Sequence, residues 1–251
     1  MKKLVILFTV LLVNLSFAQK LTIAAAANVQ YALDELVNSF KKDYPGLKIN
    51  KIISSSGKLT SQIVRGAPYD IFLSADMKYP WFVYKKGYAV TEPKVYAYGV
   101  LVLWSMKNIP LKKRGIAILL DKHIKRIAVP NPKNAPYGRE AIRVLKHYKI
   151  YERIKSKIVY GESVSQTNQY IYRKLADIGF TSKSTVVSPK LRNRGKWIEI
   201  DKKVYNPIEQ GVVLLKQGKN NEYAKKFYDF IFTQKARLIL KKYGYLIPDN
   251  E

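Results

Sequence analysis

Apolar residues along this chain follow two recurring patterns, short continuous runs and stretches with helical spacing. Segment 21–27 is a nearly continuous apolar run of strand length, and the next apolar residues are Val29, Leu33, Leu36, Val37 and Phe40. Their spacing places them on one face of a helix. The same criteria predict strands at 21–27, 48–53, 70–75, 99–104, 127–129, 158–160, 177–180 and 211–215. Helices are predicted from residue 29, at 58–65, 138–148 and 165–175, and as one long amphipathic helix at 222–242.

The alternation of strands and helices predicts the fold class. Strand–helix–strand order is typical of α/β folds in which helices cover a parallel sheet. The 251-residue chain has room for two such units of about 100 residues each. In open sheets of this kind, ligands lie beyond the carboxyl ends of strands, where the following helices begin. We therefore expect the functional site at strand-to-helix junctions.

Four junctions combine a strand end or loop with a helix start. They lie at 26–28, 54–57, 136–138 and 161–164, and they carry Asn28, Ser56, Tyr137 and Val164. The first turn of a helix presents unpaired backbone N–H groups and the positive end of the helix dipole, so it can hold an anion without a cationic side chain. Each junction could equally be an ordinary helix cap, because Asn and Ser are common cap residues. Together, two from each half of the chain, they could surround one small anion.

The polar groups at these junctions favour a fully ionised oxyanion. The first three junctions offer hydroxyl, amide and backbone donors and no carboxylate. A ligand that carries a proton, such as hydrogen phosphate, would require an acceptor, whereas sulfate or molybdate requires only donors. Glu162 is the exception, and we expect it to point away from the site. Lys58 and Arg139 flank the site, and we expect neither to contact the anion.

Several classes of protein are excluded or disfavoured by composition. The chain has no cysteine and two histidines, His123 and His147, so disulfides, thiolate metal sites and a cysteine nucleophile are ruled out. Segment 161–165 resembles a nucleophile elbow but ends in Ser165 instead of glycine. Segment 56–58 (SGK) lacks the other residues of a phosphate-binding loop. We therefore expect a protein that is not an enzyme and that binds neither a cofactor nor a free metal cation.

The charge of the chain is strongly positive. It has 45 Lys and Arg against 18 Asp and Glu, a formal net charge of +27, and such a surface attracts anions. A secreted basic nucleic-acid-binding protein is therefore an alternative. The lysines are spread along every predicted helix instead of forming one stripe, which makes this alternative the weaker one.

The first 18 residues have the layout of a secretory signal peptide. Lys2 and Lys3 form a basic start, residues 4–13 are mostly apolar, and small residues precede Gln19. Ten apolar residues are too few for a bilayer span, which takes about 20. No cysteine follows the apolar run, which excludes a lipid anchor. We expect an exported protein, cleaved before Gln19 and located in the periplasm.

Four segments at or beside the junctions carry a family resemblance. They are 21–28 (LTIAAAAN), 54–63 (SSSGKLTSQI), 66–76 (GAPYDIFLSAD) and 131–138 (NPKNAPYG). The chain resembles the periplasmic molybdate-binding proteins of ABC importers, a family that also binds tungstate. The second and third segments are long and specific, and weaker similarity covers nearly the whole chain after residue 18.

The resemblance implies a fold and a set of ligand contacts. The fold would be a two-lobed α/β periplasmic-binding-protein fold of type II, with lobe I at 19–98 and 207–251, lobe II at 99–206, and the ligand cleft between them. The oxyanion contacts would be Ala27, Asn28, Ser56 and the backbone N–H groups of Tyr137 and Val164. Many family members also place a tyrosine hydroxyl on the anion. Ser182 stands at that position here, so we expect the tyrosine contact to be missing or replaced by Ser182 through water.

The function implied by the resemblance is capture of molybdate or tungstate and delivery to the membrane permease of an ABC importer. The protein would act as a monomer, without nucleic acid. A sulfate-type oxyanion-binding protein of the same fold remains an alternative.

Overall fold

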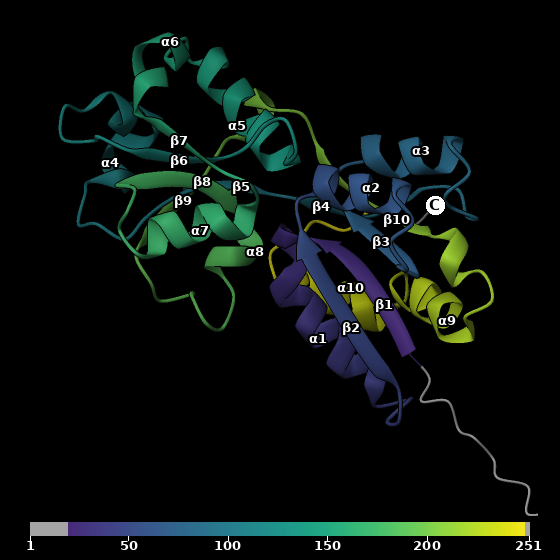
Figure 1. The fold of residues 1–251 in the computed structure, drawn as a ribbon. Coiled ribbons are helices and arrows are strands. Elements are labelled where there is room, and N and C mark those ends of the chain that lie inside the picture. Colours follow the sequence, from purple (N-terminus) through teal and green to yellow (C-terminus); the bar gives the residue numbers. More distant parts are fainter. Residues whose placement is uncertain (1–19, 249–251) are drawn as a thin grey trace, which may run out of the picture.

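The computed structural model describes residues 20–248, which form two α/β lobes lying side by side (Figure 1). The expected signal peptide at 1–18 lies outside the described residues. Each lobe is built on one five-stranded sheet, and the sheets name the lobes. Lobe I holds β1 (Lys20–Ala26), β2 (Lys48–Ser54), β3 (Ile71–Ser74), β4 (Lys94–Gly99) and β10 (Ile208–Leu214), in the order β2-β1-β3-β10-β4. Lobe II holds β5 (Leu101–Ser105), β6 (Ile127–Pro130), β7 (Ile158–Gly161), β8 (Ile178–Ser182) and β9 (Lys196–Glu199), in the order β7-β6-β8-β5-β9.

Helices cover both faces of each sheet. In lobe I they are α1 (Gln30–Lys41), α2 (Ser56–Val64), α3 (Lys78–Lys85), α9 (Glu222–Phe230) and α10 (Gln234–Lys242). In lobe II they are α4 (Leu111–Arg114), α5 (Pro136–His147), α6 (Tyr151–Ile154), α7 (Val164–Tyr172) and α8 (Lys183–Val186). Short 3-10 turns complete the path at η1 (Ala27–Val29), η2 (Gly115–Leu120), η3 (Lys155–Lys157), η4 (Lys202–Val204) and η5 (Lys216–Gly218).

The core of lobe I explains why the first apolar run is a central strand. β1 pairs in parallel with β2 on one side and β3 on the other, and all of its residues after Lys20 are buried. Leu33, Leu36 and Phe40 of α1 pack on one face of this sheet, together with α9 and α10. Helices α2 and α3 cover the opposite face. A strand covered on both faces needs a continuous apolar run, as the sequence of β1 has.

The predicted α/β class is confirmed, but the expectation of parallel sheets is wrong in one respect, because both sheets are mixed. Strand β10 is antiparallel to β3 and β4, and β5 is antiparallel to β8 and β9. The chain leaves lobe I after β4 and returns as β10. A strand that arrives from the other lobe enters its sheet at the carboxyl ends of β1 and β3, so it must run against them. The same argument holds for β5 on entering lobe II.

Other expectations are corrected in detail. The expected strand at 99–104 is found as β5 but begins two residues later, because Gly99 ends β4 and the chain passes between the lobes before Leu101. The expected long helix at 222–242 is two helices, because Thr233 is extended and its side chain accepts the N–H of Ala236 to start α10. Strands β4 and β9 and helices α3, α4, α6 and α8 were not predicted.

Among residues 20–248, no helix is both long enough and apolar enough to cross a membrane.

Candidate oxyanion-binding site

The first junction follows the carboxyl end of β1, where Asn28 lies in η1 before α1 begins. Its side chain is buried, and its Nδ2 donates to Oε1 of Gln210 at 2.7 Å and to the hydroxyl of Tyr245 at 2.9 Å. The backbone oxygen of Asn28 accepts from Oγ of Ser184 at 2.6 Å and from Tyr245 at 3.0 Å. Since Ser184 belongs to lobe II, the first junction is bonded to the opposite lobe.

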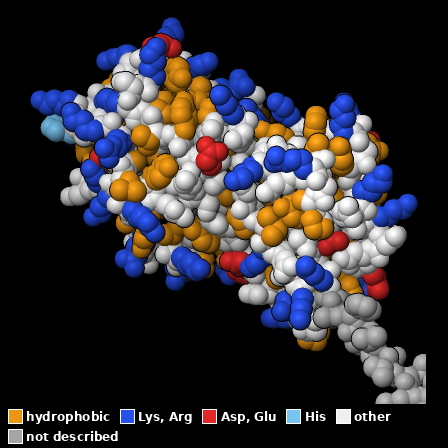
Figure 2. All heavy atoms as spheres, in the orientation of Figure 1, with side chains coloured by type: hydrophobic (Ala, Val, Ile, Leu, Met, Phe, Trp, Pro, Cys, Tyr) orange, Lys and Arg blue, Asp and Glu red, His pale blue; other side chains and the backbone are white. Residues whose placement is uncertain are grey.

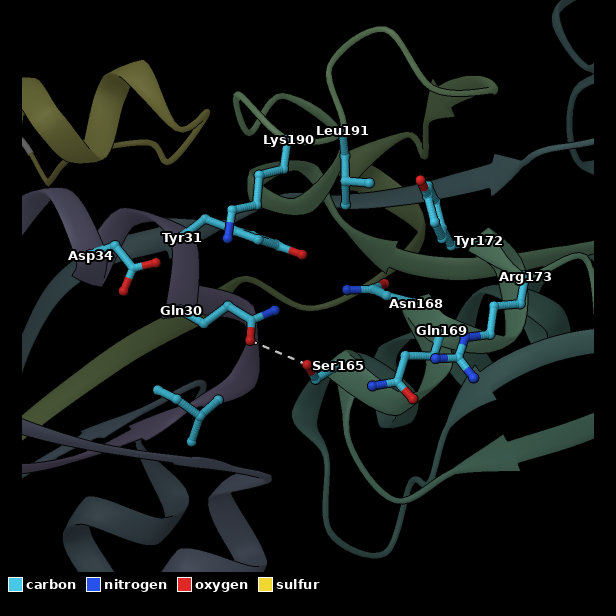
Figure 3. Close-up of a pocket in the computed structure, with 11 residues that line it drawn as sticks. Gln30, Tyr31, Asp34, Ser165, Asn168, Gln169, Tyr172, Arg173, Lys190 and Leu191 are labelled. Atoms are coloured by element: carbon cyan, nitrogen blue, oxygen red, sulfur yellow. Dashed lines mark hydrogen bonds between the residues drawn. The ribbon is translucent and has the colours of Figure 1, made fainter.

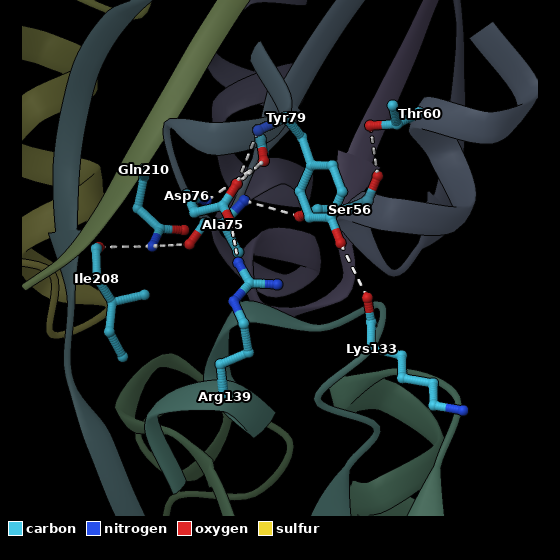
Figure 4. A network of polar contacts seen from close by, with 10 residues as sticks. Ser56, Thr60, Ala75, Asp76, Tyr79, Lys133, Arg139, Ile208 and Gln210 are labelled. Atoms are coloured by element: carbon cyan, nitrogen blue, oxygen red, sulfur yellow. Dashed lines mark hydrogen bonds and ion pairs between the residues drawn. The ribbon is translucent and has the colours of Figure 1, made fainter. Parts of the chain in front are cut away.

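The second junction is the start of α2. Ser56 is its first residue, is fully buried, and accepts the backbone N–H of Ala75 on its Oγ at 3.0 Å (Figure 4). The backbone N–H of Gly57 donates across the cleft to the oxygen of Asn134 at 3.0 Å. The start of α2 therefore faces the loop that precedes α5 in lobe II.

The third and fourth junctions lie side by side in lobe II, at the starts of α5 and α7. Pro136 opens α5, a position where its missing N–H costs nothing. Gly138 packs so tightly that an added Cβ would lie 1.9 Å from the oxygen of Pro130, so this turn requires glycine. Val164 opens α7 after the cap residue Ser163, whose Oγ accepts the N–H of Gln166 at 3.3 Å.

The structure brings the five predicted contact residues together. Ala27, Tyr137 and Val164 belong to one buried cluster that also contains Ala75, the residue bonded to Ser56. None of the five is more than 4% exposed. All five lie in the first turn of a helix, where a backbone N–H has no partner within the helix. Helices from both lobes therefore begin at the same buried place.

Unpartnered polar atoms mark this place. Within residues 20–248, five buried side-chain atoms have no hydrogen-bond partner, and three of them lie here: Oδ1 of Asn28, Oγ of Ser55 and the hydroxyl of Tyr137. The two hydroxyls can donate to an anion, whereas Oδ1 of Asn28 only accepts, so a fully ionised oxyanion cannot be its partner. Burial and the nearby Tyr245 raise the pKa of Tyr137 well above its usual value, while Asn28 opposes the rise. Its phenol is therefore a neutral donor at physiological pH.

Charged side chains meet beside the site. Arg139 of α5 forms an ion pair across the cleft with Asp76, which follows β3 in lobe I (Figure 4). The guanidinium also lies 5.5 Å from the ring centre of Tyr79, and the Tyr79 hydroxyl donates to the oxygen of Lys133 at 3.1 Å. Burial raises the pKa of Asp76, and the charge of Arg139 opposes that rise. Arg139 is thus committed to a carboxylate, and Lys58 is exposed to solvent.

Two residues singled out from the sequence lie at the margin of the site. Ser182 is buried, and its Oγ lies 2.8 Å from Oγ of Ser184 and 3.0 Å from Oγ1 of Thr185. It therefore reaches Asn28 only through Ser184. Glu162 is exposed, and its carboxylate lies 3.5 Å from Nδ2 of Asn131.

Three residues around Asn28 were missed by the sequence analysis. They are Ser184, Gln210 and Tyr245, which are 156, 182 and 217 residues away from it along the chain. One signal was available for Gln210, because a glutamine within an apolar strand run requires a buried partner. Nothing in the sequence indicated that the partner is Asn28.

A groove opens beside the buried site, between α1 and α7. It has a volume of about 530 Å³, and both lobes contribute to its lining, including Gln30, Tyr31, Asn168 and Lys190 (Figure 3). Gln30 and Ser165 face each other across it, with Oγ of Ser165 3.2 Å from Oε1 of Gln30. The lobes therefore touch at the groove but do not seal it.

Positive charge is spread over the surface instead of concentrated at the site. On the face shown in Figure 2, Lys and Arg side chains are scattered over both lobes, among few acidic ones. Within residues 20–248, no three side chains of the metal-binding types His, Asp and Glu are placed to hold a metal ion.

Comparison with known proteins supports the geometric reading. Residues 21–246 match the family model described as bacterial extracellular solute-binding protein. The molybdate-binding protein ModA of Azotobacter vinelandii is 35% identical over 229 residues, covering 91% of this chain and 90% of the relative. The protein of the same name from Rhodobacter capsulatus is 35% identical over 224 residues, covering 89% and 86%. The solved periplasmic molybdate-binding protein of Azotobacter vinelandii superposes with a TM-score of 0.86 at 31% identity, covering 91% of this chain and 100% of that one. The family resemblance that the sequence segments at the junctions indicated is confirmed.

Proposed function

The chain belongs to the family of bacterial extracellular solute-binding proteins, and we propose that the solute it captures is molybdate or tungstate. One observation carries the proposal. Four helix starts, two from each lobe, meet at one buried place that has neutral donors and, among residues 20–248, no free cationic side chain. The names of the two relatives and the superposed structure support the choice of oxyanion.

The proposed contacts are Ala27, Asn28, Ser56 and the backbone N–H groups of Tyr137 and Val164. Backbone dipoles at helix starts stabilise an anion in a dry site, where charge–dipole interactions are stronger than in water. We propose that the spacing of these donors favours molybdate and tungstate over the smaller sulfate. Ligand binding would join the lobes, and the hinge would be formed by the two passages between them, consistent with boundaries at 19–98 and 207–251 for lobe I and 99–206 for lobe II.

We further propose that the protein works outside the cytoplasm. Residues 1–18 would direct export and be removed before Gln19, and the loaded protein would then deliver its solute to the membrane permease of an ABC importer. It would do so as a monomer, without catalysis, a cofactor or nucleic acid. The scattered Lys and Arg side chains would form a solvated surface and not a nucleic-acid track.

Calorimetric titration of the exported protein tests the ligand. The full chain is expressed with its own N-terminus, recovered from the periplasm of the host, and titrated with molybdate, tungstate, sulfate and phosphate at 0.15 M salt. We expect one-to-one binding of molybdate and tungstate with a Kd below about 1 μM, equivalent to about −8 kcal/mol, and far weaker binding of sulfate.

The outcomes separate the alternatives. Tight sulfate or phosphate binding would keep the site and overturn the choice of ligand. A protein that binds none of the four anions would refute oxyanion capture, and salt-sensitive binding of DNA would then favour the nucleic-acid alternative. The mass of the recovered protein tests the cleavage site, which we expect immediately before Gln19.

A further inference from the structure

Gln210 is a buried amide in the middle of an apolar strand. It is fully buried in β10, two residues after the strand begins on its return from lobe II. The pairing of β10 with β4 shifts register between Gln210 and Gly211. Such irregularities re-aim a side chain and are frequent beside functional sites. Here the Gln210 side chain lies at the carboxyl end of β3, next to the oxygen of Ala75 (Figure 4).

The orientation of the Gln210 amide is fixed by its own contacts. Its Nε2 donates to the oxygen of Ile208 at 2.8 Å and approaches the oxygen of Ala75 at 3.4 Å. Both partners are carbonyl groups, which only accept, so the nitrogen must face them. The Oε1 atom is then left to face Asn28.

The orientation of Asn28 follows from that of Gln210. Oε1 of Gln210 only accepts, so Asn28 must present its Nδ2, and the two atoms are 2.7 Å apart. The Tyr245 hydroxyl takes the second proton of the same nitrogen at 2.9 Å and donates its own to the backbone oxygen of Asn28. The side chain and backbone of Asn28 are therefore both held, and its Oδ1 faces away from Gln210 without a partner.

We propose that Gln210 is a positioning residue of the oxyanion site and acts on the anion through the backbone N–H of Asn28, because both protons of the Asn28 side chain are already donated to Gln210 and Tyr245. It connects the first junction to the strand that returns from lobe II through the hydrogen bond from Nδ2 of Asn28 to Oε1 of Gln210. Gln210 does not contact the solute. This inference rests on the proposed function, because it assigns the support for one of the proposed contacts.

A double-mutant cycle with molybdate as the probe tests the proposal. The variants are Gln210→Met, Asn28→Ala and the double variant, with Kd measured by calorimetry and thermal midpoint by scanning. Methionine keeps the length of the side chain and removes its hydrogen bonds with Asn28, Ile208 and Ala75. We expect Gln210→Met to weaken binding about 10-fold in the wild-type background and less than 2-fold when Asn28 is already alanine, because coupled residues are not additive.

A matched control separates positioning from general stability. Gln62 lies in α2 of lobe I, six residues after Ser56, and its Oε1 accepts one hydrogen bond, from the Tyr69 hydroxyl at 3.2 Å. Gln62→Leu therefore removes a glutamine hydrogen bond from the same lobe, and we expect molybdate affinity to stay within 2-fold of wild type. If Gln210→Met lowers the thermal midpoint as Gln62→Leu does and leaves Kd unchanged, Gln210 is merely structural and the proposal is overturned.

The remaining outcomes are also decisive. Equal losses of affinity in the two backgrounds, with wild type binding molybdate tightly, would overturn the positioning role and leave the proposed function intact. Failure of the wild type to bind any oxyanion would refute the proposed function itself. Should Gln210→Met not fold, the side-chain NH₂ signals of Asn28 in the NMR spectrum of wild type provide a second measurement. We expect slow hydrogen exchange for both protons, and fast exchange would contradict the assigned contacts.

Discussion

Two of the contacts that join the lobes near the site use opposite chemistry. The neutral contact is made by Asn28 and Ser184, both buried, through a 2.6 Å hydrogen bond to a backbone oxygen. The charged contact is the ion pair of Asp76 with Arg139, whose side chains are 16% and 29% exposed. Because Arg139 is neutralised by Asp76, its charge adds little to the attraction of the site for anions. The comparison agrees with the proposed function, in which the charged contact joins the lobes and neutral dipoles would bind the solute.

The largest effect is expected from adding a charge to the neutral contact. In Asn28→Asp, a buried carboxylate would face both the bound anion and Oε1 of Gln210, neither of which can donate. Repulsion between like charges about 4 Å apart costs about 4 kcal/mol at an effective dielectric constant of 20, so molybdate affinity should fall roughly 1,000-fold. Calorimetry measures the change.

The control for that variant is Asn50→Asp, which makes the same change at an exposed position of β2. We expect its affinity to match wild type at 0.15 M salt. Retention of wild-type affinity by Asn28→Asp would remove Asn28 from the proposed site.

At the charged contact we expect a smaller loss of molybdate affinity, and the loss should differ between the two partners of the ion pair. Arg139→Gln leaves Asp76 largely buried without its counter-ion, so the closed state is penalised and affinity should fall about 10-fold, or about 1.4 kcal/mol. Asp76→Asn leaves the more exposed Arg139, which can turn to water, and it keeps an oxygen that can accept the N–H of Tyr79. Its loss should stay below 3-fold, and the double variant should recover most of the affinity lost in Arg139→Gln.

The pKa of Asp76 adds a stability test of the same variant. A folded-state pKa raised by burial means that ionised Asp76 disfavours folding at neutral pH, and the penalty is relieved as pH falls through that pKa. The thermal midpoint of Asp76→Asn at pH 7 should therefore equal or exceed that of wild type. Arg143→Gln is the control, because Arg143 pairs with Glu140 on the same helix and within the same lobe. Equal losses of molybdate affinity in Arg139→Gln, Asp76→Asn and Arg143→Gln would show that the ion pair between the lobes has no special role.

The smallest effect is expected from alkaline pH. Burial raises the pKa of both Tyr137 and Tyr245 above the usual value of a tyrosine, so both phenols stay neutral as the pH rises from 7 to 9. A donor with a raised pKa is lost only above that pKa, so molybdate affinity should be flat over this range. Titrations at pH 7, 8 and 9 check this. A 10-fold weakening by pH 9 would reveal an ionising group at the site and contradict its neutral character.

The local part of this architecture could be predicted from the sequence. The run 21–27 corresponds to β1, because a strand buried on both faces needs apolar residues at nearly every position. The spacing from Val29 to Phe40 corresponds to α1, because a helix buried on one face needs apolar residues at helical intervals. The junctions followed from the same pattern, since a strand that ends before a helix places the intervening residue at a sheet edge. That reasoning located Asn28, Ser56, Tyr137 and Val164 but could not test their contact with an anion.

The non-local part could not be predicted. The direction of β10 depends on where the chain re-enters the first sheet, and the positions of Gln210 and Tyr245 depend on that path. The break before α10 depends on Thr233 acting as a cap, which the amphipathic pattern at 222–242 does not reveal. The pairing of Asp76 with Arg139 requires both lobes to be in place, so the sequence showed two flanking charges and not their partnership.

The near-complete burial of the site has a kinetic consequence. The five proposed contact residues are all buried at the meeting of the lobes, so a solute bound among them as proposed would leave mainly when the lobes separate. Its residence time would then depend largely on the hinge. Competing solute outside would leave that time unchanged, whereas a partner that pulls the lobes apart would shorten it.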